Sequence, residues 1–240
     1  MEIKTLNLKL KTIEKDTPDT VLLTFELNEE LEFSPGQFMM IEGVIGEGEK
    51  RKSIKRAYSI ASSPKDKGIL QFLIKQEGEK GLSHKLVNSK EGDEYGFTGP
   101  FGKFAFEDIS VKNVILLAAG SGLAPMRSIS RYITSTNLPA EVQLFYSVRK
   151  PINIARKQEL EELKEKYPNF EFVVTVTRPD ETVWHGEIGR INASMIKKYA
   201  KSIDDSLFFI CGTPGMVRDM VNLLQNELGV SQDNINMEQW

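Results

Sequence analysis

The sequence predicts two domains of different class, an antiparallel β-barrel at residues 1–108 and an α/β domain with a parallel sheet at residues 109–240. Short runs that alternate apolar and polar residues fill the first half, between turns rich in glycine, proline and charge; this is typical of small barrels. Continuous apolar runs alternate with amphipathic stretches in the second half, which indicates a buried parallel sheet with helices on both faces.

The first half should contain six strands and one short helix. The strands are expected at residues 3–10, 20–27, 36–43, 55–61, 68–76 and 92–99. The helix is expected at 81–88, with Gly81 and Ser83 near its start. Each strand is short and is followed by a turn signal, so consecutive strands can pair as antiparallel neighbours.

The second half should alternate strands and helices. Strands are expected at 113–120, 142–148, 170–177, 206–212 and 235–238, and helices at 123–134, 155–167, 193–200 and 214–228. This order is that of a doubly wound nucleotide-type domain, although a fold of this kind does not by itself fix a function.

Composition excludes several classes of protein. The formal net charge of −3 argues against a general nucleic-acid binder. Cys211 is the single cysteine, so one chain can form neither an internal disulfide nor a four-thiolate metal centre. His84 and His185 form no metal-ligand motif, and no metal is expected. The first residues alternate polar and apolar side chains, which is a strand pattern and not that of a signal peptide. No apolar run is long enough to cross a bilayer. A cytoplasmic location is therefore expected.

Two glycine-rich turns follow buried strands of the second half. Gly120 and Gly122 come after the first strand in "AAGSGLAP", and Gly212 follows Cys211 in "FFICGTPGM". Such turns let a ligand approach the backbone, and the next helix can offer amides to an anion. Each turn alone is equally consistent with a tight strand–helix connection, and a lone cysteine is usually a small buried thiol. Two such turns on one sheet edge favour a nucleotide site.

The stretch "RAYSIASSP", residues 56–64, is unusual for a half-buried strand. Arg56 and Tyr58 would share one face, and Ser59 would point to the other. A guanidinium suits a pyrophosphate, a phenol ring can pack on a flat heterocycle, and a hydroxyl can donate or accept a hydrogen bond. An edge strand with one amphipathic face is the structural alternative.

Five motifs occur in order: "RAYSIASSP", "TGPFGK" (98–103), "GSGLAPMRS" (120–128), "CGTPGM" (211–216) and "NMEQW" (236–240). Together they resemble the ferredoxin–NADP reductase family, in which an FAD-binding barrel precedes an NADP-binding α/β domain. The resemblance covers nearly the whole chain. Related oxygenase reductases carry an added iron–sulfur domain, for which this chain has no cysteines.

The resemblance implies a set of site residues. The FAD-binding residues would be Arg56, Ala57, Tyr58, Ser59, Leu73, Ile74, Lys75, Gly81, Leu82, Ser83 and Thr98. The coenzyme-binding residues would be Gly120, Ser121, Gly122, Pro125, Arg149, Thr177, Arg178, Cys211, Gly212 and Met216, and Trp240 would cover the flavin face that the nicotinamide needs. Ser59, Cys211, Glu238 and Trp240 would be the catalytic group, with Ser59 near flavin N5 and Cys211 beside the nicotinamide.

The expected activity is that of a flavoprotein oxidoreductase, which passes electrons between NAD(P)H and ferredoxin or flavodoxin through FAD. NADPH is favoured over NADH, because Thr177 and Arg178 match a family pair that binds the 2′-phosphate; a solvated arginine at a strand end is the alternative. Residues 50–56 carry five cations, which could steer an acidic carrier or simply form a solvated hairpin.

Two other hypotheses stay open at this stage. The chain could be an electron-transfer subunit of a larger redox complex, such as a hydrogenase, a transhydrogenase or an oxygenase reductase. It could also be a flavoprotein that senses the NAD(P)H pool without turnover. Size-exclusion chromatography of the native protein would separate the stand-alone enzyme from the subunit, and turnover with a one-electron acceptor would exclude the sensor.

Overall fold

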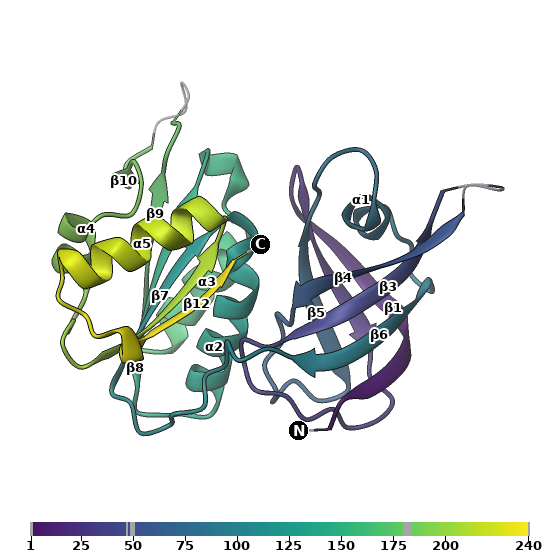
Figure 1. Cartoon of the computed structure of the whole chain (residues 1–240), viewed down its shortest axis with the longest axis horizontal. Coiled ribbons are helices and arrows are strands. Elements are labelled where there is room, and N and C mark those ends of the chain that lie inside the picture. Colours follow the sequence, from purple (N-terminus) through teal and green to yellow (C-terminus); the bar gives the residue numbers. More distant parts are fainter. Residues whose placement is uncertain (1, 47, 49–50, 180–183, 240) are drawn as a thin grey trace. The chain divides into compact units, whose positions relative to one another are not determined.

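The computed structural model describes residues 2–46, 48, 51–179 and 184–239. The chain forms two compact units. The first comprises residues 1–107 together with Arg127–Tyr132, and the second comprises residues 108–126 and 133–240 (Figure 1). The middle of one helix, α2 (Leu123–Ser135), therefore groups with the first unit, although the helix begins and ends in the second.

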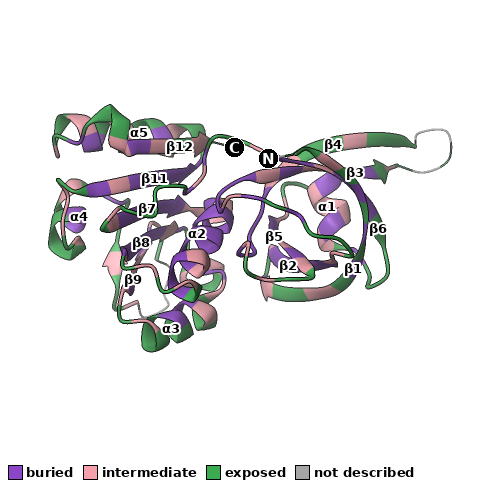
Figure 2. Cartoon of the chain, turned by 90° about the horizontal axis from the view of Figure 1, so that it is seen from below, coloured by how far each residue is buried: buried purple, intermediate pink, exposed green. Residues whose placement is uncertain are grey.

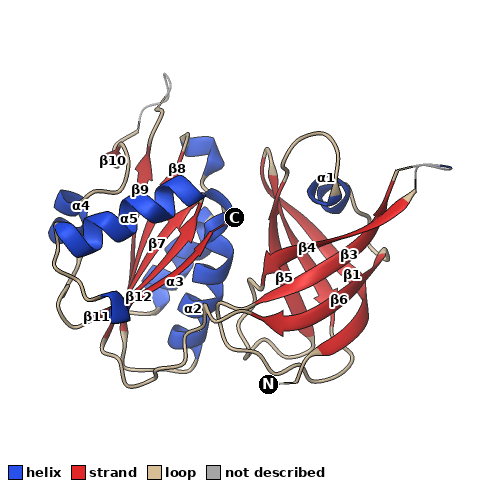
Figure 3. Cartoon of the chain, viewed as in Figure 1, coloured by secondary structure: helices blue, strands red, loops and turns tan. Residues whose placement is uncertain are grey.

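The first unit is an antiparallel six-stranded sheet in the order β4-β3-β6-β1-β2-β5. The strands are β1 (Lys4–Thr17), β2 (Thr20–Glu26), β3 (Phe38–Ile45), β4 (Lys52–Ser59), β5 (Ile69–Lys75) and β6 (Glu94–Phe101). Helix α1 (Leu82–Val87) lies between β5 and β6 in the chain (Figure 3). The sheet curves around an apolar core, so the first unit is a half-barrel.

The core of the half-barrel is built from alternate residues of its strands. Leu6, Leu8 and Leu10 of β1 are buried, whereas the residues between them are exposed or half-exposed. Phe25, Phe72 and Phe97 meet in this core, with the rings of Phe25 and Phe97 centred 4.9 Å apart in an edge-on arrangement. Alternation along each strand thus places one face inward, as a half-buried antiparallel sheet requires.

The second unit is a six-stranded sheet in the order β10-β9-β8-β7-β11-β12, and every strand pair in it is parallel. The strands are β7 (Asn113–Ala119), β8 (Glu141–Val148), β9 (Phe170–Val176), β10 (Glu187–Ile188), β11 (Ser206–Gly212) and β12 (Ile235–Gln239). Helices α3 (Lys157–Lys166), α4 (Ala193–Tyr199) and α5 (Pro214–Asn226) connect them, together with α2. The central strands β7, β8 and β11 are largely buried (Figure 2).

The predicted fold class, an antiparallel β-barrel followed by an α/β domain with a parallel sheet, is confirmed, and the barrel takes the form of a six-stranded half-barrel. Three details differ from the expectation. β4 begins at Lys52 and ends at Ser59, so Ile60 and Ala61, which were expected in this strand, lie outside it. β1 continues to Thr17, past the apolar alternation that marked its start, and β10 is a two-residue strand that no pattern predicted. β10 exists because it pairs with Thr175 and Val176 of β9, a contact that is set by tertiary structure. Among the described helices, none has the length and apolar character that crossing a bilayer requires.

Candidate functional site

The strand β4 presents the residues of the "RAYS" stretch in two directions. Arg56 is exposed, Tyr58 is half-buried and packs against the barrel core, and Ser59 is buried at 6% exposure. The Arg56 guanidinium donates to the Lys55 carbonyl oxygen at 2.8 Å through Nη1. An exposed guanidinium near a half-exposed phenol ring fits a ligand that has both a phosphate and a flat ring.

The environment of Tyr58 includes charge from the loop that follows β5. Burial, aided by the negative charge of Glu77, raises the pKa of Tyr58 to about 12, and the positive charge of Arg56 opposes the rise. The phenol is therefore neutral at physiological pH and remains a hydrogen-bond donor.

Helix α1 contacts β3, β4 and β5, and β4 also contacts β5, so three of the predicted FAD segments meet. Leu73 and Ile74 are buried within β5 and pair with β2, which leaves their backbone as the feature that a ligand can meet. At Gly81 a Cβ would meet no atom within 4 Å, so there is room at this turn. The Ser83 hydroxyl accepts a hydrogen bond from the Glu77 amide at 3.1 Å.

Thr98 and Ala57 lie in one row across three strands. Thr98 of β6 is opposite Met40 of β3, and Met40 is opposite Ala57 of β4. Opposed residues in antiparallel strands share a face of the sheet. Thr98 is therefore on the sheet face of Ala57 and Ser59, and Tyr58 is on the other face. Leu82 is buried at 3% exposure and belongs to the core.

The two glycine-rich turns of the second unit follow neighbouring strands. β7 is paired with β8 on one side and with β11 on the other. The strands that follow β7 in the chain are thus added first on one side of it and later on the other, so the strand order reverses at β7. Ligands of open α/β sheets bind outside the carboxyl ends of the strands at such a switch point. The turns 120–122 and 212–215 lie at the carboxyl ends of these two strands.

Gly122 is required by a close approach of two backbones. A Cβ at this position would lie 2.1 Å from the Cys211 carbonyl oxygen and 2.6 Å from its carbonyl carbon. Gly120 has φ +55, which favours glycine, and a Cβ there would meet no atom within 4 Å. The turn therefore contacts the β11 backbone at Gly122 and has free space beside Gly120. Ser121 is half-exposed, and Pro125 is buried in the first turn of α2.

The turn after β11 is closed by its own helix. The Thr213 hydroxyl accepts from the Met216 amide at 3.4 Å and caps α5. A Cβ on Gly212 would lie 3.1 Å from the Met216 sulfur and 3.2 Å from the Ala119 Cβ, so Gly212 and Met216 lie together beside the end of β7. The structure therefore gathers Gly212, Met216 and the first glycine-rich turn at one edge of the sheet.

Cys211 and Glu238 are register partners in β11 and β12. The Cys211 side chain is fully buried, whereas Glu238 is half-exposed. Ala118 of β7 is the partner of Cys211 on its other side. The placement of Cys211 beside a nicotinamide stays a prediction, as does the role of Glu238, and Trp240 lies outside the described residues.

Two exposed arginines adjoin one another at the carboxyl ends of β8 and β9. The Arg178 amide donates to the Arg149 carbonyl oxygen at 2.8 Å, and the Thr177 amide donates to the Val148 carbonyl oxygen at 2.9 Å. These bonds continue the β8–β9 backbone pairing past both strands, so Arg149 and Arg178 lie on adjacent segments of the chain; continued register would place Arg149 opposite Thr177. A pair of guanidiniums at this edge can bind a phosphate group.

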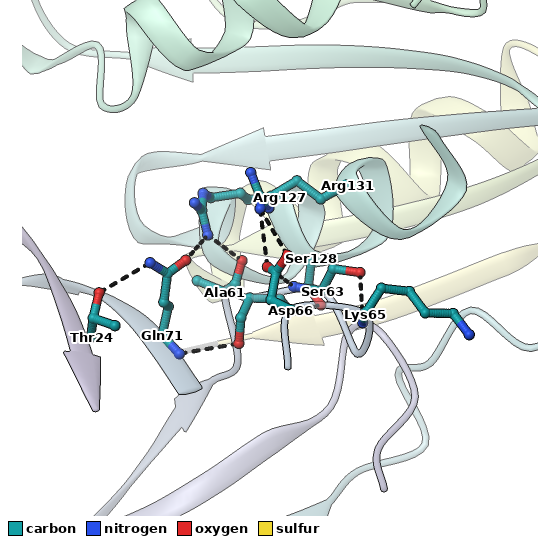
Figure 4. Close-up of polar contacts among 10 residues, drawn as sticks. Thr24, Ala61, Ser63, Lys65, Asp66, Gln71, Arg127, Ser128 and Arg131 are labelled. Atoms are coloured by element: carbon teal, nitrogen blue, oxygen red, sulfur yellow. Dashed lines mark hydrogen bonds and ion pairs between the residues drawn. The ribbon is translucent and has the colours of Figure 1, made fainter. Parts of the chain in front are cut away.

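Sequence reasoning assigned no role to Arg127, although the residue lies within the quoted motif "GSGLAPMRS". Arg127 is buried at 4% exposure and donates through Nη1 to the Ala61 carbonyl oxygen at 2.6 Å and to Gln71 Oε1 at 3.0 Å (Figure 4). The available signal was an arginine that follows the glycine-rich turn 120–122 closely in the sequence. The sequence does not show that this arginine is buried or which segment it binds.

The fold and these sites define a class of protein: a two-domain dinucleotide-binding protein with a barrel that suits a diphosphate ligand and an α/β sheet with a second nucleotide site. Residues 7–106 match the oxidoreductase FAD-binding domain family, and residues 116–222 match the oxidoreductase NAD-binding domain family.

Curated relatives agree with these matches. NADH-cytochrome b5 reductase 2 of Lodderomyces elongisporus is 30% identical over 220 residues, which cover 89% of this chain and 72% of that protein. One subunit of the Na⁺-translocating NADH-quinone reductase of Marinomonas sp. is 30% identical over 198 residues, and the match covers 77% of this chain and 48% of that subunit. The solved ferredoxin reductase of carbazole 1,9a-dioxygenase has a TM-score of 0.85 at 26% identity, covering 100% of this chain and 70% of that one.

The chain belongs to the ferredoxin reductase superfamily of FAD- and NAD-binding oxidoreductases. It is an FAD-dependent NAD(P)H oxidoreductase that works in electron transfer. The predicted family is thereby confirmed, whereas the individual site residues stay predictions.

Proposed function

We propose that the protein oxidises NADPH and delivers electrons one at a time to an acidic protein carrier of the ferredoxin or flavodoxin type. The observation that most directly supports a flavin in this reaction is that β4, β5 and α1, which carry Arg56, Tyr58 and Ser83, contact one another in the unit that matches the FAD-binding family. Bound FAD would supply the chemistry, since it accepts a hydride from a reduced nicotinamide and can release electrons singly.

The residues of the first unit have side chains suited to FAD, and there is room beside Gly81 for a ligand. The exposed Arg56 guanidinium would bind the pyrophosphate, and the open side of Gly81 leaves room for it. The half-exposed Tyr58 ring would pack on the flavin, and Ser59 would hold its hydroxyl toward flavin N5. The backbone of Leu73–Lys75 would contact the cofactor as well, because β5 adjoins both β4 and α1.

The residues of the second unit fit the coenzyme. The turn 120–122 is open at Gly120, and its amides would bind the coenzyme pyrophosphate. Arg149 and Arg178 would bind the 2′-phosphate, because a backbone hydrogen bond joins these two exposed residues at the carboxyl ends of β8 and β9. Both relatives described above are named for NADH, so the preference for NADPH is supported only by this arginine pair.

The coenzyme preference is tested with three variants. Arg178→Ala and Arg149→Ala should each lower kcat/KM for NADPH by roughly tenfold to a hundredfold, the equivalent of about 1.5–3 kcal/mol for a hydrogen bond to a charged group. NADH should be nearly unaffected, since it has no phosphate for the guanidiniums to bind. Lys201→Ala is the control, because Lys201 pairs with Glu141 at the opposite end of β8. Equal losses for both coenzymes, or a wild-type preference for NADH, would contradict the assignment.

The acceptor is identified by steady-state reduction of a ferredoxin, a flavodoxin and a dye with each coenzyme. The protein should also release FAD on denaturation, and chromatography would show FMN instead if the diphosphate assignment is wrong. Fast reduction of the dye with no reduction of either carrier would contradict the proposed partner while leaving the flavin assignment intact.

A role as a subunit of a larger redox complex is the second candidate. It is favoured by the similarity to one subunit of a Na⁺-translocating NADH-quinone reductase, of which this chain spans about half. Size-exclusion chromatography of the native protein, drawn from its own cells, separates the two functions. Elution with other polypeptides in a fixed ratio supports the role in a complex, and elution as a single polypeptide supports the stand-alone reductase.

A further inference from the structure

The backbone that leaves β4 after Ser59 is irregular and buried. Ile60, Ala61 and Ser62 each have 0% exposure, and Ser63 has 1%. None of the four belongs to a strand or helix. Buried backbone groups need hydrogen-bond partners, and a segment outside regular structure must find them elsewhere. We call residues 60–63 the connector.

Two glutamines bind one side of the connector. The Ile60 amide donates to the Gln37 carbonyl oxygen at 2.9 Å, and the Ala61 amide donates to the Gln71 carbonyl oxygen at 2.8 Å. The Ser62 hydroxyl accepts from the Gln71 amide at 3.1 Å. The connector is thereby joined to β5, which contains Gln71.

The acceptors of the connector are bound by consecutive residues of α2. Arg127 Nη1 donates to the Ala61 carbonyl oxygen at 2.6 Å, and the Ser128 hydroxyl donates to the Ser62 carbonyl oxygen at 2.7 Å (Figure 4). The same Arg127 nitrogen donates to Gln71 Oε1 at 3.0 Å, and the Gln71 side-chain amide group donates to Thr24 of β2. One guanidinium therefore binds both the connector and the half-buried side-chain amide of Gln71 in β5.

Arg131 makes a different kind of contact one turn later. It pairs with both oxygens of Asp66, at 3.0 Å and 3.1 Å, and Asp66 in turn accepts from the Ser63 amide. Arg131 is half-exposed, in contrast to the buried Arg127. Arg131 thus anchors the turn that follows the connector, and Arg127 anchors the connector beside Ser59.

We propose that Arg127 is a positioning residue for Ser59: by binding the Ala61 carbonyl it fixes the end of β4 and so holds the Ser59 hydroxyl at flavin N5. This inference rests on the proposed function, which gives Ser59 its place at the flavin. Ser59 is two residues from Ala61, so rotation of the Ala61 peptide changes the direction of the β4 end. A misplacement of about 1 Å at a reacting centre can lower a rate by about a hundredfold.

The test is a double-mutant cycle between Arg127→Met and Ser59→Ala, read by the stopped-flow rate of flavin reduction by NADPH. Arg127→Met should lower this rate by at least about tenfold, within the range expected for a small misplacement. The double variant should be no slower than the slower single variant, since Arg127 acts through Ser59. Arg127→Lys, which keeps a charged donor, should recover part of the rate. The visible circular dichroism of bound FAD should change in Arg127→Met.

Arg131→Met is the matched control, because it removes an arginine–barrel contact from the same helix. It should lower the melting temperature while leaving the reduction rate within about twofold of wild type, as expected for a group away from the reacting centre. If Arg127→Met does not fold, Ser128→Ala replaces it in the cycle, since it removes the neighbouring bond to the connector.

Three results would overturn the inference: losses that multiply in the double variant, an Arg131→Met rate as low as that of Arg127→Met, or an unchanged FAD spectrum with an unchanged rate. Failure of the proposed function has a different signature. In that case wild-type protein with bound FAD would not be reduced by either coenzyme, before any variant is compared.

Discussion

At the scale of single residues, the second unit depends on a contact that leaves no room for a side chain. The Gly122 Cα faces the Cys211 carbonyl so closely that an added Cβ would lie 2.1 Å from the oxygen. The atoms in the way are backbone atoms of a central strand, which cannot move aside as a flexible side chain could. Glycine at 122 therefore serves the packing of the turn on β11 as well as any ligand.

Gly122→Ala should destabilise the protein by about 1–3 kcal/mol, the usual cost of inserting atoms into a packed region. Because the turn must move away from β11, NADP⁺ affinity should also fall. Urea denaturation of the flavin-loaded protein and a coenzyme titration measure the two effects.

Gly215→Ala is the control for that variant. A Cβ at Gly215, in the first turn of α5, would meet no atom within 4 Å, so its stability should be unchanged or slightly higher, by up to about 1 kcal/mol. A loss as large as that of Gly122→Ala would show that the turns tolerate no added methyl group and that the Cys211 contact is not the cause.

At the scale of elements, the turn between β1 and β2 is tied to the end of β5 by Asp19. Its carboxylate accepts from the Thr17 hydroxyl at 2.9 Å and from the Thr20 hydroxyl at 3.1 Å, and it pairs with Lys75 at 3.4 Å. Its carbonyl oxygen accepts from the Gln76 amide at 2.7 Å. Burial by itself would raise the pKa of Asp19, but these donors and the Lys75 charge together lower it below its ordinary value of 3.8.

A lowered pKa in the folded state means that the ionised carboxylate stabilises the fold above the unfolded pKa, and that this contribution is lost as pH falls through the folded pKa. The stability advantage of wild type over Asp19→Asn should therefore be constant above about pH 5 and shrink below about pH 4. Urea denaturation of both proteins between pH 3 and pH 7 measures the difference.

Lys75→Met provides the internal check for the Asp19 experiment. Without the ammonium, the pKa of Asp19 should be lowered less, so the pH-dependent loss of stability should be smaller and should be complete at a higher pH. An advantage of wild type over Asp19→Asn that does not depend on pH would show that the Asp19 charge makes no contribution and that only its hydrogen-bonding shape matters.

At the scale of the whole molecule, the relevant property is the uneven distribution of charge. The chain has a net charge of −3, yet Arg51, Lys52, Lys55 and Arg56 are all exposed on or beside β4. Lys55 is partly neutralised by Glu42 at 3.0 Å. The remaining local positive charge can steer an acidic carrier toward this strand, which also presents the proposed flavin residues.

Reduction of an acidic ferredoxin should therefore slow as salt is raised from 0.1 M to 1 M, over which the Debye length falls from about 10 Å to about 3 Å. Reduction of a neutral dye should not slow. The charge reversal Lys52→Glu should weaken the salt dependence, whereas Lys197→Glu on α4 makes the same change in net charge elsewhere. If neither salt nor Lys52→Glu changes the rate of ferredoxin reduction, residues 51–56 do not steer the carrier and are only a solvated segment.

The sequence by itself determined the class of each domain, the order of its elements and the family. These follow from local signals, because apolar periodicity is set by the geometry of a strand or helix and glycine-rich turns lie where strands end. It also placed the two glycine-rich turns correctly on one sheet edge, since parallel strands direct their carboxyl ends to the same side.

Tertiary structure alone decided which distant segments touch. Strand register and packing between segments far apart in the chain decide three contacts. These are the close approach of Gly122 to Cys211, the cross-strand row from Thr98 to Ala57, and the two hydrogen bonds of Arg127. A sequence pattern records the face on which a residue lies, but not the partner it meets there. The short β10 has the same explanation, because its two residues form a strand only by pairing with β9.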